Sequence, residues 1–359
     1  KISFMKRLDY IDALRGWAIV GVLTSHVSQH ADSLSGKISY FTQYGPMGVR
    51  LFFIISALTI FITLDKKKQD KKERINYFFI KRVLRIAPMY YLAIIYYIIF
   101  GVFFFSQIDY VNVISNMFFV HGLSPQTINS FVPGGWSITV EMFFYCLIPV
   151  IIKQINNLNN AITFLVVSYL FRFIAIYLTR RLIGNEGING EFLFLFFPSQ
   201  LPVFALGIIL YFIIIKQEKI RISIYNAVAL LILAAISLVF KYYNIIFVDY
   251  LLFSYAFSVL IIIMSKKKIF LLDNFIIRFI GNISYSLYII HFIVIFWLVK
   301  YQLNLLYQSS STINFCLFFT ITLLLSCFVS YITYQLIEKP FQNLGKKLIS
   351  KKQKPIFNK

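Results

Sequence analysis

The chain has few acidic residues, few histidines and few cysteines. Of its 359 residues, 14 are Asp or Glu, against 35 Lys and Arg, and only four are His and three are Cys. All three cysteines lie inside apolar runs, so we expect packed thiols rather than a disulfide framework: Cys146, Cys316 and Cys327. The sequence has no Cys/His cluster and no HExxH motif, and no GxSxG, P-loop or GxGxxG motif in a suitable context. We therefore predict neither a metal site nor a tightly bound cofactor.

Apolar residues are abundant instead. Hydrophobic residues make up 59% of the chain, with 40 Phe and 24 Tyr, and the mean hydropathy is +0.76. A soluble domain of this length cannot bury so much apolar surface, which predicts an all-α polytopic membrane protein. The formal charge of +21 is a feature of nucleic-acid-binding proteins, but here Lys and Arg cluster between apolar runs, as in cytoplasmic loops. We therefore expect contacts with membrane lipids and no nucleic-acid partner.

The apolar runs predict about ten transmembrane helices of roughly 20 residues each. They are expected at residues 11–31, 48–65, 86–106, 135–153, 161–179, 198–215, 224–241, 249–265, 279–299 and 313–336. With the N-terminus inside, the inner segments hold 27 of the 35 Lys and Arg residues, which predicts that both termini are cytoplasmic. Residues 1–342 are expected to form the membrane domain and 343–359 a short basic tail that is disordered or surface-bound. No cleavable signal peptide is expected, and 107–134 has room for a short re-entrant segment.

The first predicted span carries ionisable side chains at Asp12, Arg15 and His26. Charges at membrane depth are expensive, so they mark function or pair with one another. At about 100° per residue, the steps from Arg15 to His26 return to within about 20° of the same helix face, and Asp12 lies one turn before Arg15. One face therefore carries all three groups. Arg15 and His26 are roughly 16 Å apart along the helix axis, too far for a direct hydrogen bond.

A second group of cations follows the second predicted span. The lysine-rich run at 65–74 is interpreted as an orientation signal facing the lipid headgroups. Arg82 and Arg85 differ, because they abut the third span and share one helix face at a spacing of three. Guanidinium groups at a cytoplasmic mouth bind phosphate or pyrophosphate bidentately, but they also anchor lipid headgroups, and both interpretations stay open.

The fourth predicted span begins with a polar cluster. Ser137 and Glu141 are four residues apart, with Tyr145 one turn deeper, and Trp136 is expected to be an interfacial anchor. A carboxylate inside a span needs a partner, so Glu141 either pairs with Arg or His or takes part in catalysis.

The ninth predicted span places Ser284, Tyr288 and His291 on one face. A buried histidine is commonly a hydrogen-bonded core residue, which competes with a chemical role for His291. We expect His30 and His121 to be mainly solvated at the outer interface.

Six motifs occur in order along nearly the whole chain. They are Tyr10–Gly16 with His26, Gly48–Ser56, Arg82–Pro88, Trp136–Glu141, Ile283–His291 and Ile337–Phe341. In these motifs the chain resembles the integral-membrane acyltransferase-3 family, which O-acylates bacterial surface polysaccharides and related acceptors. One departure is Ala57, where the family commonly has Gly, and it would tighten packing near the second span without removing a chemical group.

The resemblance implies an O-acyltransferase, most often an O-acetyltransferase, of the bacterial cytoplasmic (inner) membrane. Its donor would be cytoplasmic acyl-CoA, usually acetyl-CoA. Its acceptor would be a hydroxyl of an envelope glycan such as O-antigen or exopolysaccharide, either free or lipid-linked. The family's Arg-x10-His pair falls on Arg15 and His26. Its Arg-x-x-Arg pair, associated with the donor, falls on Arg82 and Arg85.

The residues suit this chemistry. An imidazole, with an ordinary pKa near 6.5, suits His26 as general base on the acceptor hydroxyl. Arg15 would bind the donor or pair with Asp12. Glu141 would orient His26 or the acceptor, and His291 would be a second base or a structural partner. Ser137 and Tyr288 are expected to support the site.

Two other functions remain open at this level. A transporter or flippase would also need buried charges and many helices, but typically shows repeated halves, and no repeat is evident. A glycosyltransferase that uses a lipid-linked sugar would need paired acidic residues in a large outer loop. Asp109 is the only Asp or Glu between residues 106 and 135.

Overall fold

The structure is a computed structural model that describes residues 8–31, 34, 36–65, 71–105, 109–184, 186–220, 222–242, 249–307 and 309–352. Within these ranges the regular secondary structure is helical. The N-terminal half comprises α1 (Asp9–Ser28), α2 (Lys37–Thr42), η1 (Gly45–Met47), α3 (Gly48–Leu64), α4 (Lys71–Phe105), α5 (Tyr110–Met117), η2 (His121–Leu123), α6 (Gly135–Gln154) and α7 (Leu158–Ile183). The C-terminal half comprises α8 (Ile188–Leu195), α9 (Phe197–Leu210), η3 (Tyr211–Ile215), α10 (Ile224–Tyr242), α11 (Asp249–Lys266), α12 (Phe275–Asn282), α13 (Ser284–Lys300), α14 (Ser311–Thr333), η4 (Tyr334–Glu338) and α15 (Lys339–Lys352).

Each predicted span coincides with a helix or with consecutive helices. In the described ranges, six helical stretches are long and apolar enough to cross a membrane, and the pair α12 and α13 is a seventh if it counts as one span. The apolar parts of α10 and α11, Ile224–Ser237 and Tyr250–Lys266, are shorter. The chain is thus all-helical with several membrane-spanning candidates. Ten spans and cytoplasmic termini stay predictions.

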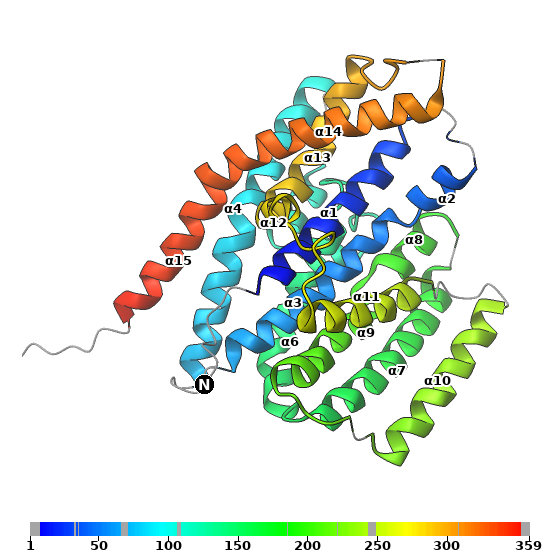
Figure 1. The fold of residues 1–359 in the computed structure, drawn as a ribbon, viewed down its shortest axis with the longest axis vertical. Coiled ribbons are helices and arrows are strands. Elements are labelled where there is room, and N and C mark those ends of the chain that lie inside the picture. Colours follow the sequence, from blue (N-terminus) through cyan, green and yellow to red (C-terminus); the bar gives the residue numbers. More distant parts are fainter. Residues whose placement is uncertain are drawn as a thin grey trace, which may run out of the picture.

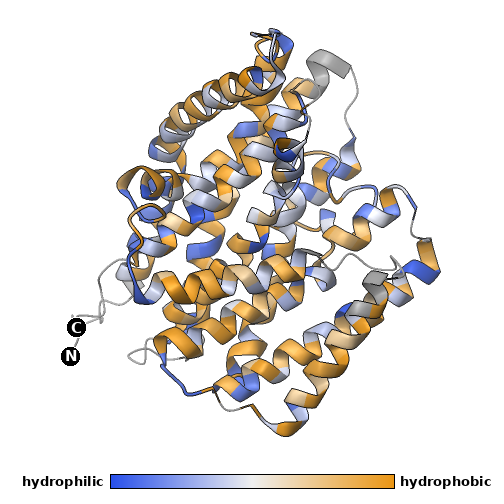
Figure 2. Ribbon diagram, turned by 45° about the vertical axis from the view of Figure 1, so that its right-hand side comes forward, coloured by the Kyte–Doolittle hydropathy of each residue, from blue (hydrophilic) through white to orange (hydrophobic). Residues whose placement is uncertain are grey.

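The outer surface of the helices is apolar. Hydrophobic residues cover most of the helical ribbon, and hydrophilic residues gather in loops and at several helix ends (Figure 2). Leu231 on α10 is 71% exposed and Phe328 on α14 is 65% exposed. Such extensive apolar exposure is unfavourable in water and fits a surface that faces lipid. In Figure 1, α14 and α15 run along one edge of the molecule and α10 along the opposite edge, with α1, α3 and α9 between them.

Helix α1 crosses α12 at very short range. A Cβ added to Gly281 would lie 1.7 Å from the carbonyl oxygen of Asp12, and one added to Gly16 would lie 2.2 Å from that of Ile277. Only glycine permits this approach of two backbones. The crossing holds the charged first turns of α1 against the start of the α12–α13 segment.

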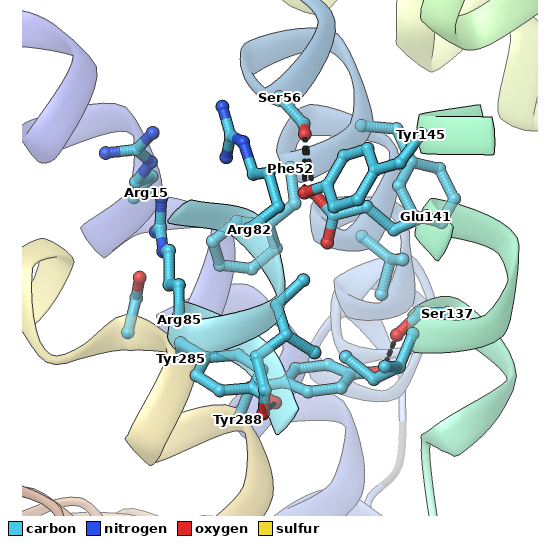
Figure 3. Close-up of a pocket in the computed structure, with 15 residues that line it drawn as sticks. Arg15, Phe52, Ser56, Arg82, Arg85, Ser137, Glu141, Tyr145, Tyr285 and Tyr288 are labelled. Carbon is cyan, nitrogen blue, oxygen red and sulfur yellow. Dashed lines mark hydrogen bonds between the residues drawn. The ribbon is translucent and has the colours of Figure 1, made fainter. Parts of the chain in front are cut away.

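The ninth predicted span is broken rather than straight. α12 and α13 meet at a bend of 79° near Ile283. The first residues after the bend, Ser284, Tyr285 and Tyr288, point into the interior of the bundle (Figure 3). A further irregularity, the π-helix η4, joins α14 to α15 and ends at the buried Glu338. π-helical turns are often found at functional sites.

The structure also shows how Ala57 and the C-terminal segment pack. Ala57 is fully buried and packs where α3 meets α9, since a Cβ on Gly207 would lie 2.7 Å from the Ala57 methyl group. Ala57 therefore lies in a closely packed contact between these two helices. The segment after Gln342 continues as α15 to Lys352, with Ile349 buried. The tail is therefore helical up to Lys352, which contradicts the disordered alternative and leaves the surface-bound one open. Its last residues, 353–359, lie outside the described ranges.

Candidate functional site

Helices α1, α3, α4, α6 and α13 surround a cavity, which we call the arginine cavity (Figure 3). Its lining includes three arginines and one carboxylate: Arg15, Arg82, Arg85 and Glu141. The remaining lining residues are Val49, Phe52, Phe53, Ser56, Ile86, Ser137, Ile138, Tyr145, Ser284, Tyr285 and Tyr288. The cavity thus brings Arg15 of the first motif together with Arg82 and Arg85 of the third motif. The sequence predicts that all three face the donor but does not show that they share one cavity.

One wall of the cavity carries a compact hydrogen-bonded group. The Ser56 hydroxyl donates to Glu141 Oε1 at 2.5 Å, and the Tyr145 hydroxyl donates to the same oxygen. Glu141 and Tyr145 are one turn apart on α6, and Ser56 reaches them from α3. The carboxylate therefore has two hydroxyl partners, and its charge also interacts with the charges of Arg15 and Arg85. Pairing with arginine and a part in catalysis were the alternatives predicted for Glu141, and this geometry is compatible with both.

The three arginines differ in their partners. Arg15 Nη1 donates to Asp12 Oδ1 at 3.3 Å, so the predicted pairing of these residues is confirmed. The charge of Arg85 interacts with that of Glu338, which accepts a hydrogen bond of 2.7 Å from Ser286. Arg82 forms no ion pair within the described part of the chain. Its guanidinium lies 5.4 Å from the centre of the Tyr145 ring, beside the Ser56–Glu141 wall.

Tyr288 lines the arginine cavity at the end that lies next to the start of α6. Its hydroxyl accepts a hydrogen bond from Ser137 Oγ at 2.9 Å and donates to the carbonyl oxygen of Gly134 at 3.0 Å. Ser137 and Tyr288 thereby tie the start of α6 to α13, and their predicted supporting role stays a prediction. Gly134 has φ of +76°, and a Cβ there would lie 2.9 Å from the Tyr288 hydroxyl oxygen, so glycine is needed at this turn.

His26 lines a different cavity, which we call the histidine cavity. Its lining is largely aromatic and consists of His26, Gln29, His30, Tyr96, Tyr97, Phe100, Pro133, Phe292, Ile293, Ile295 and Phe296. Arg15 and His26 therefore serve separate cavities, which agrees with the prediction that they do not hydrogen-bond. Glu141 lines the arginine cavity, so it makes no direct contact that would orient His26.

His291 lies between the two cavities. Its ring centre is 5.9 Å from that of Tyr288 and 5.5 Å from that of His26. His291 is fully buried, and its Nδ1 donates to the Leu287 carbonyl oxygen at 3.1 Å. This bond assigns the proton to Nδ1 and leaves Nε2 as an unprotonated nitrogen, which has no hydrogen-bond partner among the described residues. Two imidazoles thus face each other where the tyrosine end of the arginine cavity meets the histidine cavity.

Two expectations for the outer region are wrong. His121 is buried rather than solvated, and its Nε2 donates to the Gly135 carbonyl oxygen at 3.0 Å. Trp136 is also buried rather than interfacial. Its ring is one of three aromatic faces around the buried guanidinium of Arg50. His121 packs against Tyr90 of α4 and Trp136 against Phe53 of α3, and no local pattern reveals such contacts between helices. His30 is exposed, as expected.

Sequence reasoning did not identify several residues of the site. Ser56 and Glu338 stood in family-like motifs without an assigned role, and Tyr285 gave no signal of its own. Tyr285 donates to the Ile86 carbonyl oxygen at 2.7 Å and so fixes α4 next to Arg85. The spacing of Ser56 from Glu141, 85 positions along the chain, explains why only the fold brings them together.

The arrangement can bind an anion and move protons. Three guanidiniums suit a phosphate-bearing ligand, and a carboxylate with two hydroxyls suits proton transfer. In the described part of the chain, no group of three or more His, Cys, Asp or Glu side chains is arranged to hold a metal ion. The linings of the two cavities together supply a carboxylate, hydroxyls, imidazoles and guanidinium groups.

The model of a family described as an acyltransferase domain, Acyl_transf_3, matches residues 8–335. The chain belongs to this acyltransferase family, and the resemblance seen in its motifs is confirmed. No solved structure matches the chain.

Several curated proteins that are similar to this chain have names that specify O-acetyltransferases. A protein of Staphylococcus aureus strain COL, provisionally named an O-acetyltransferase, is 24% identical over 98% of this chain and 60% of its own length. The corresponding protein of strain N315 has the same identity of 24% over the same shares of the two chains. The peptidoglycan O-acetyltransferase OatA of Listeria monocytogenes is 26% identical over 42% of this chain and 26% of its own length. The chain thus spans less than two thirds of each of these relatives.

Proposed function

We propose that this chain is an O-acyltransferase, in particular an O-acetyltransferase, that transfers an acyl group from acyl-CoA to a hydroxyl of an envelope glycan. The observation that carries the proposal is the pair of neighbouring cavities, one lined by arginines and the other by histidine and aromatic rings. The family membership and the names of the relatives support acyl transfer.

The donor belongs in the arginine cavity. Acyl-CoA carries several phosphate charges, and guanidinium groups bind phosphates bidentately. Arg82 has no carboxylate partner within the described residues, so it is available to such a ligand. We assign Arg15, Arg82 and Arg85 to donor binding, with Asp12 holding Arg15 in place.

The acceptor belongs in the histidine cavity. His26 lines this cavity and acts as general base on the acceptor hydroxyl, with His291 as the second imidazole of the pair. The aromatic lining suits a sugar, because apolar ring faces pack against pyranose C–H groups. The name of the Listeria relative specifies peptidoglycan, which makes peptidoglycan one candidate acceptor beside O-antigen and exopolysaccharide.

The cellular setting follows from the same reasoning. We place the protein in the bacterial cytoplasmic (inner) membrane with both termini inside, the arginine cavity open to cytoplasmic acyl-CoA and the histidine cavity toward the envelope. Excess Lys and Arg in the predicted inner segments support this orientation.

A labelled-donor assay tests the proposal. Membranes containing wild type, His26→Ala or Arg82→Ala receive acetyl-CoA labelled on the acetyl group, and label in the envelope glycan is measured. We expect label with wild type and its loss in both variants. Equal labelling in all three would overturn the site assignment. Glycan that crosses the membrane without ever acquiring label would favour a transporter instead.

A further inference from the structure

The Ser56 hydroxyl lies where an activated nucleophile would lie. It lines the arginine cavity and donates a hydrogen bond of 2.5 Å to Glu141 Oε1. A serine hydroxyl is a weak nucleophile unless a base within hydrogen-bond reach takes its proton. Glu141 fulfils this geometric requirement.

A third residue holds the base in place. The Tyr145 hydroxyl donates to the same carboxylate oxygen of Glu141 and lies 3.5 Å from Ser56 Oγ. A nucleophile, a base and a group that orients the base form the arrangement found in many acyl-transfer sites. The Arg82 guanidinium, 5.4 Å from the centre of the Tyr145 ring, adds a cation on the same wall. Such a cation stabilises the negative charge that develops on a carbonyl oxygen under attack.

A covalent intermediate suits an enzyme whose donor and acceptor bind in separate cavities. The arginines and Ser56 line one cavity, whereas His26 lines the other. A covalent acyl carrier would allow the bulky donor to leave before the acceptor reacts.

We propose that Ser56 carries the acyl group as a covalent ester between donor and acceptor. The proposal rests on the acyltransferase function proposed above. In the first step, Ser56 Oγ attacks the thioester carbonyl, a C–O bond forms and the C–S bond breaks. The serine proton passes through Glu141 to the sulfur, and CoA leaves as the thiol. In the second step, the acceptor hydroxyl attacks the acyl carbon, the bond to Ser56 Oγ breaks, and the acceptor's proton ends on Ser56 Oγ.

Two half-reaction assays test this proposal on the full chain in nanodiscs without acceptor. In the first, acetyl-CoA and isotopically labelled CoA exchange their CoA part only if the acetyl group leaves CoA and returns. In the second, acetyl-labelled donor is quenched rapidly, and peptide mass spectrometry locates the acetyl group. We expect exchange and an ester on Ser56 in wild type. Both should fall roughly 10³-fold or more in Ser56→Ala and persist in His26→Ala, which blocks only the second step.

Three matched variants test whether the Ser56 oxygen is the atom that carries the acyl group. Cys146→Ala excludes a thioester on the exposed thiol next to Tyr145. Ser168→Ala removes another buried hydroxyl, one bonded to the Leu165 carbonyl oxygen of its own helix, and should leave both signals unchanged. In the Cys146→Ala background, Ser56→Cys should accumulate a thioester that neutral hydroxylamine cleaves. This accumulation would show that the position itself accepts the acyl group.

The outcomes separate the two proposals. Glycan acylation by wild type without CoA exchange would mean direct transfer and would overturn the role of Ser56, as would acetyl mapped to Tyr145. Retained glycan acylation in Ser56→Ala would overturn it as well. If wild type neither exchanges CoA nor acylates any glycan, the acyltransferase function itself fails.

Discussion

The imidazole rings of His26 and His291 lie with their centres 5.5 Å apart, although one residue belongs to α1 and the other to α13. His291 Nδ1 donates a hydrogen bond to the Leu287 carbonyl oxygen. Its Nε2 is therefore the nitrogen that can accept a hydrogen bond, and it has no partner among the described residues. This pair marks the place where the tyrosine end of the arginine cavity approaches the histidine cavity. In the proposed function, one face of α1 therefore contributes Arg15 to the donor cavity and His26 to the acceptor cavity.

The first prediction concerns His26. Replacing it with Ala should lower the rate of glycan acetylation by about 10²–10⁴-fold, because a positioned general base contributes that much. His121→Gln removes an imidazole that lines neither cavity and should leave the rate close to wild type. Initial rates with acetyl-labelled donor, normalised to protein amount, measure the difference. Equal losses in the two variants would point to a general effect of losing an imidazole.

The second prediction concerns Arg82. Arg82→Lys keeps the charge but loses the planar fork, so the KM for acetyl-CoA should rise by about tenfold with little change in kcat. Arg181→Lys is the matched control, since Arg181 lies over the Tyr177 ring away from both cavities. Steady-state kinetics with varied donor would measure both. An unchanged KM in Arg82→Lys would remove this residue from donor binding.

The third prediction concerns Glu338. Its carboxylate is 2% exposed and accepts a hydrogen bond from Ser286, and its charge interacts with Arg85. Glu338→Gln keeps the shape but removes the charge that faces Arg85, so we expect a higher KM for acetyl-CoA. Gln335→Glu adds a charge at another position of the same π-helix and serves as the control. A fall in kcat at constant KM would assign Glu338 to the chemical step instead.

The fourth prediction concerns the crossing of α1 and α12. A methyl group at position 281 would lie 1.7 Å from the Asp12 carbonyl oxygen, which the backbone cannot accommodate without moving. Gly281→Ala should destabilise the protein by about 1–3 kcal/mol or more. In Gly21→Ala the nearest atom is 3.4 Å away, so this variant should be tolerated. Thermal unfolding in detergent compares the two, and equal melting temperatures would contradict the tight crossing.

The fifth prediction concerns pH. Burial lowers the pKa of His121, although hydrogen bonds with the backbone at Gly135 and Ser115 oppose the shift. In the unfolded chain this imidazole takes up a proton near pH 6.5, whereas the folded protein does so only at lower pH. Stability should therefore fall as the pH is lowered through and below 6.5.

The variant His121→Gln isolates this contribution. Its amide can still donate to the Gly135 carbonyl oxygen but does not titrate. Melting temperatures of wild type and His121→Gln between pH 5 and 8 should converge or cross as the pH falls. Parallel curves would show that His121 does not contribute to the pH dependence.

Much of the local structure was predictable because it depends on local patterns. Apolar runs bounded by charged loops located a helix for every predicted span, since a helix satisfies its own backbone hydrogen bonds inside an apolar medium. Helical periodicity likewise placed Asp12 beside Arg15, where they pair. The motifs indicated the family, which the match over residues 8–335 confirms.

The sequence by itself thus determined that the chain is helical and apolar on its outside, and which family it belongs to. The tertiary structure alone decided which polar groups meet. It paired Ser56 with Glu141, brought His291 to His26, assigned Arg15 and His26 to separate cavities, and buried His121. The physical reason is that periodicity fixes which side of its own helix a residue occupies, whereas the neighbour on that side depends on how helices cross. Here those crossings depend on close glycine contacts and a 79° break between α12 and α13.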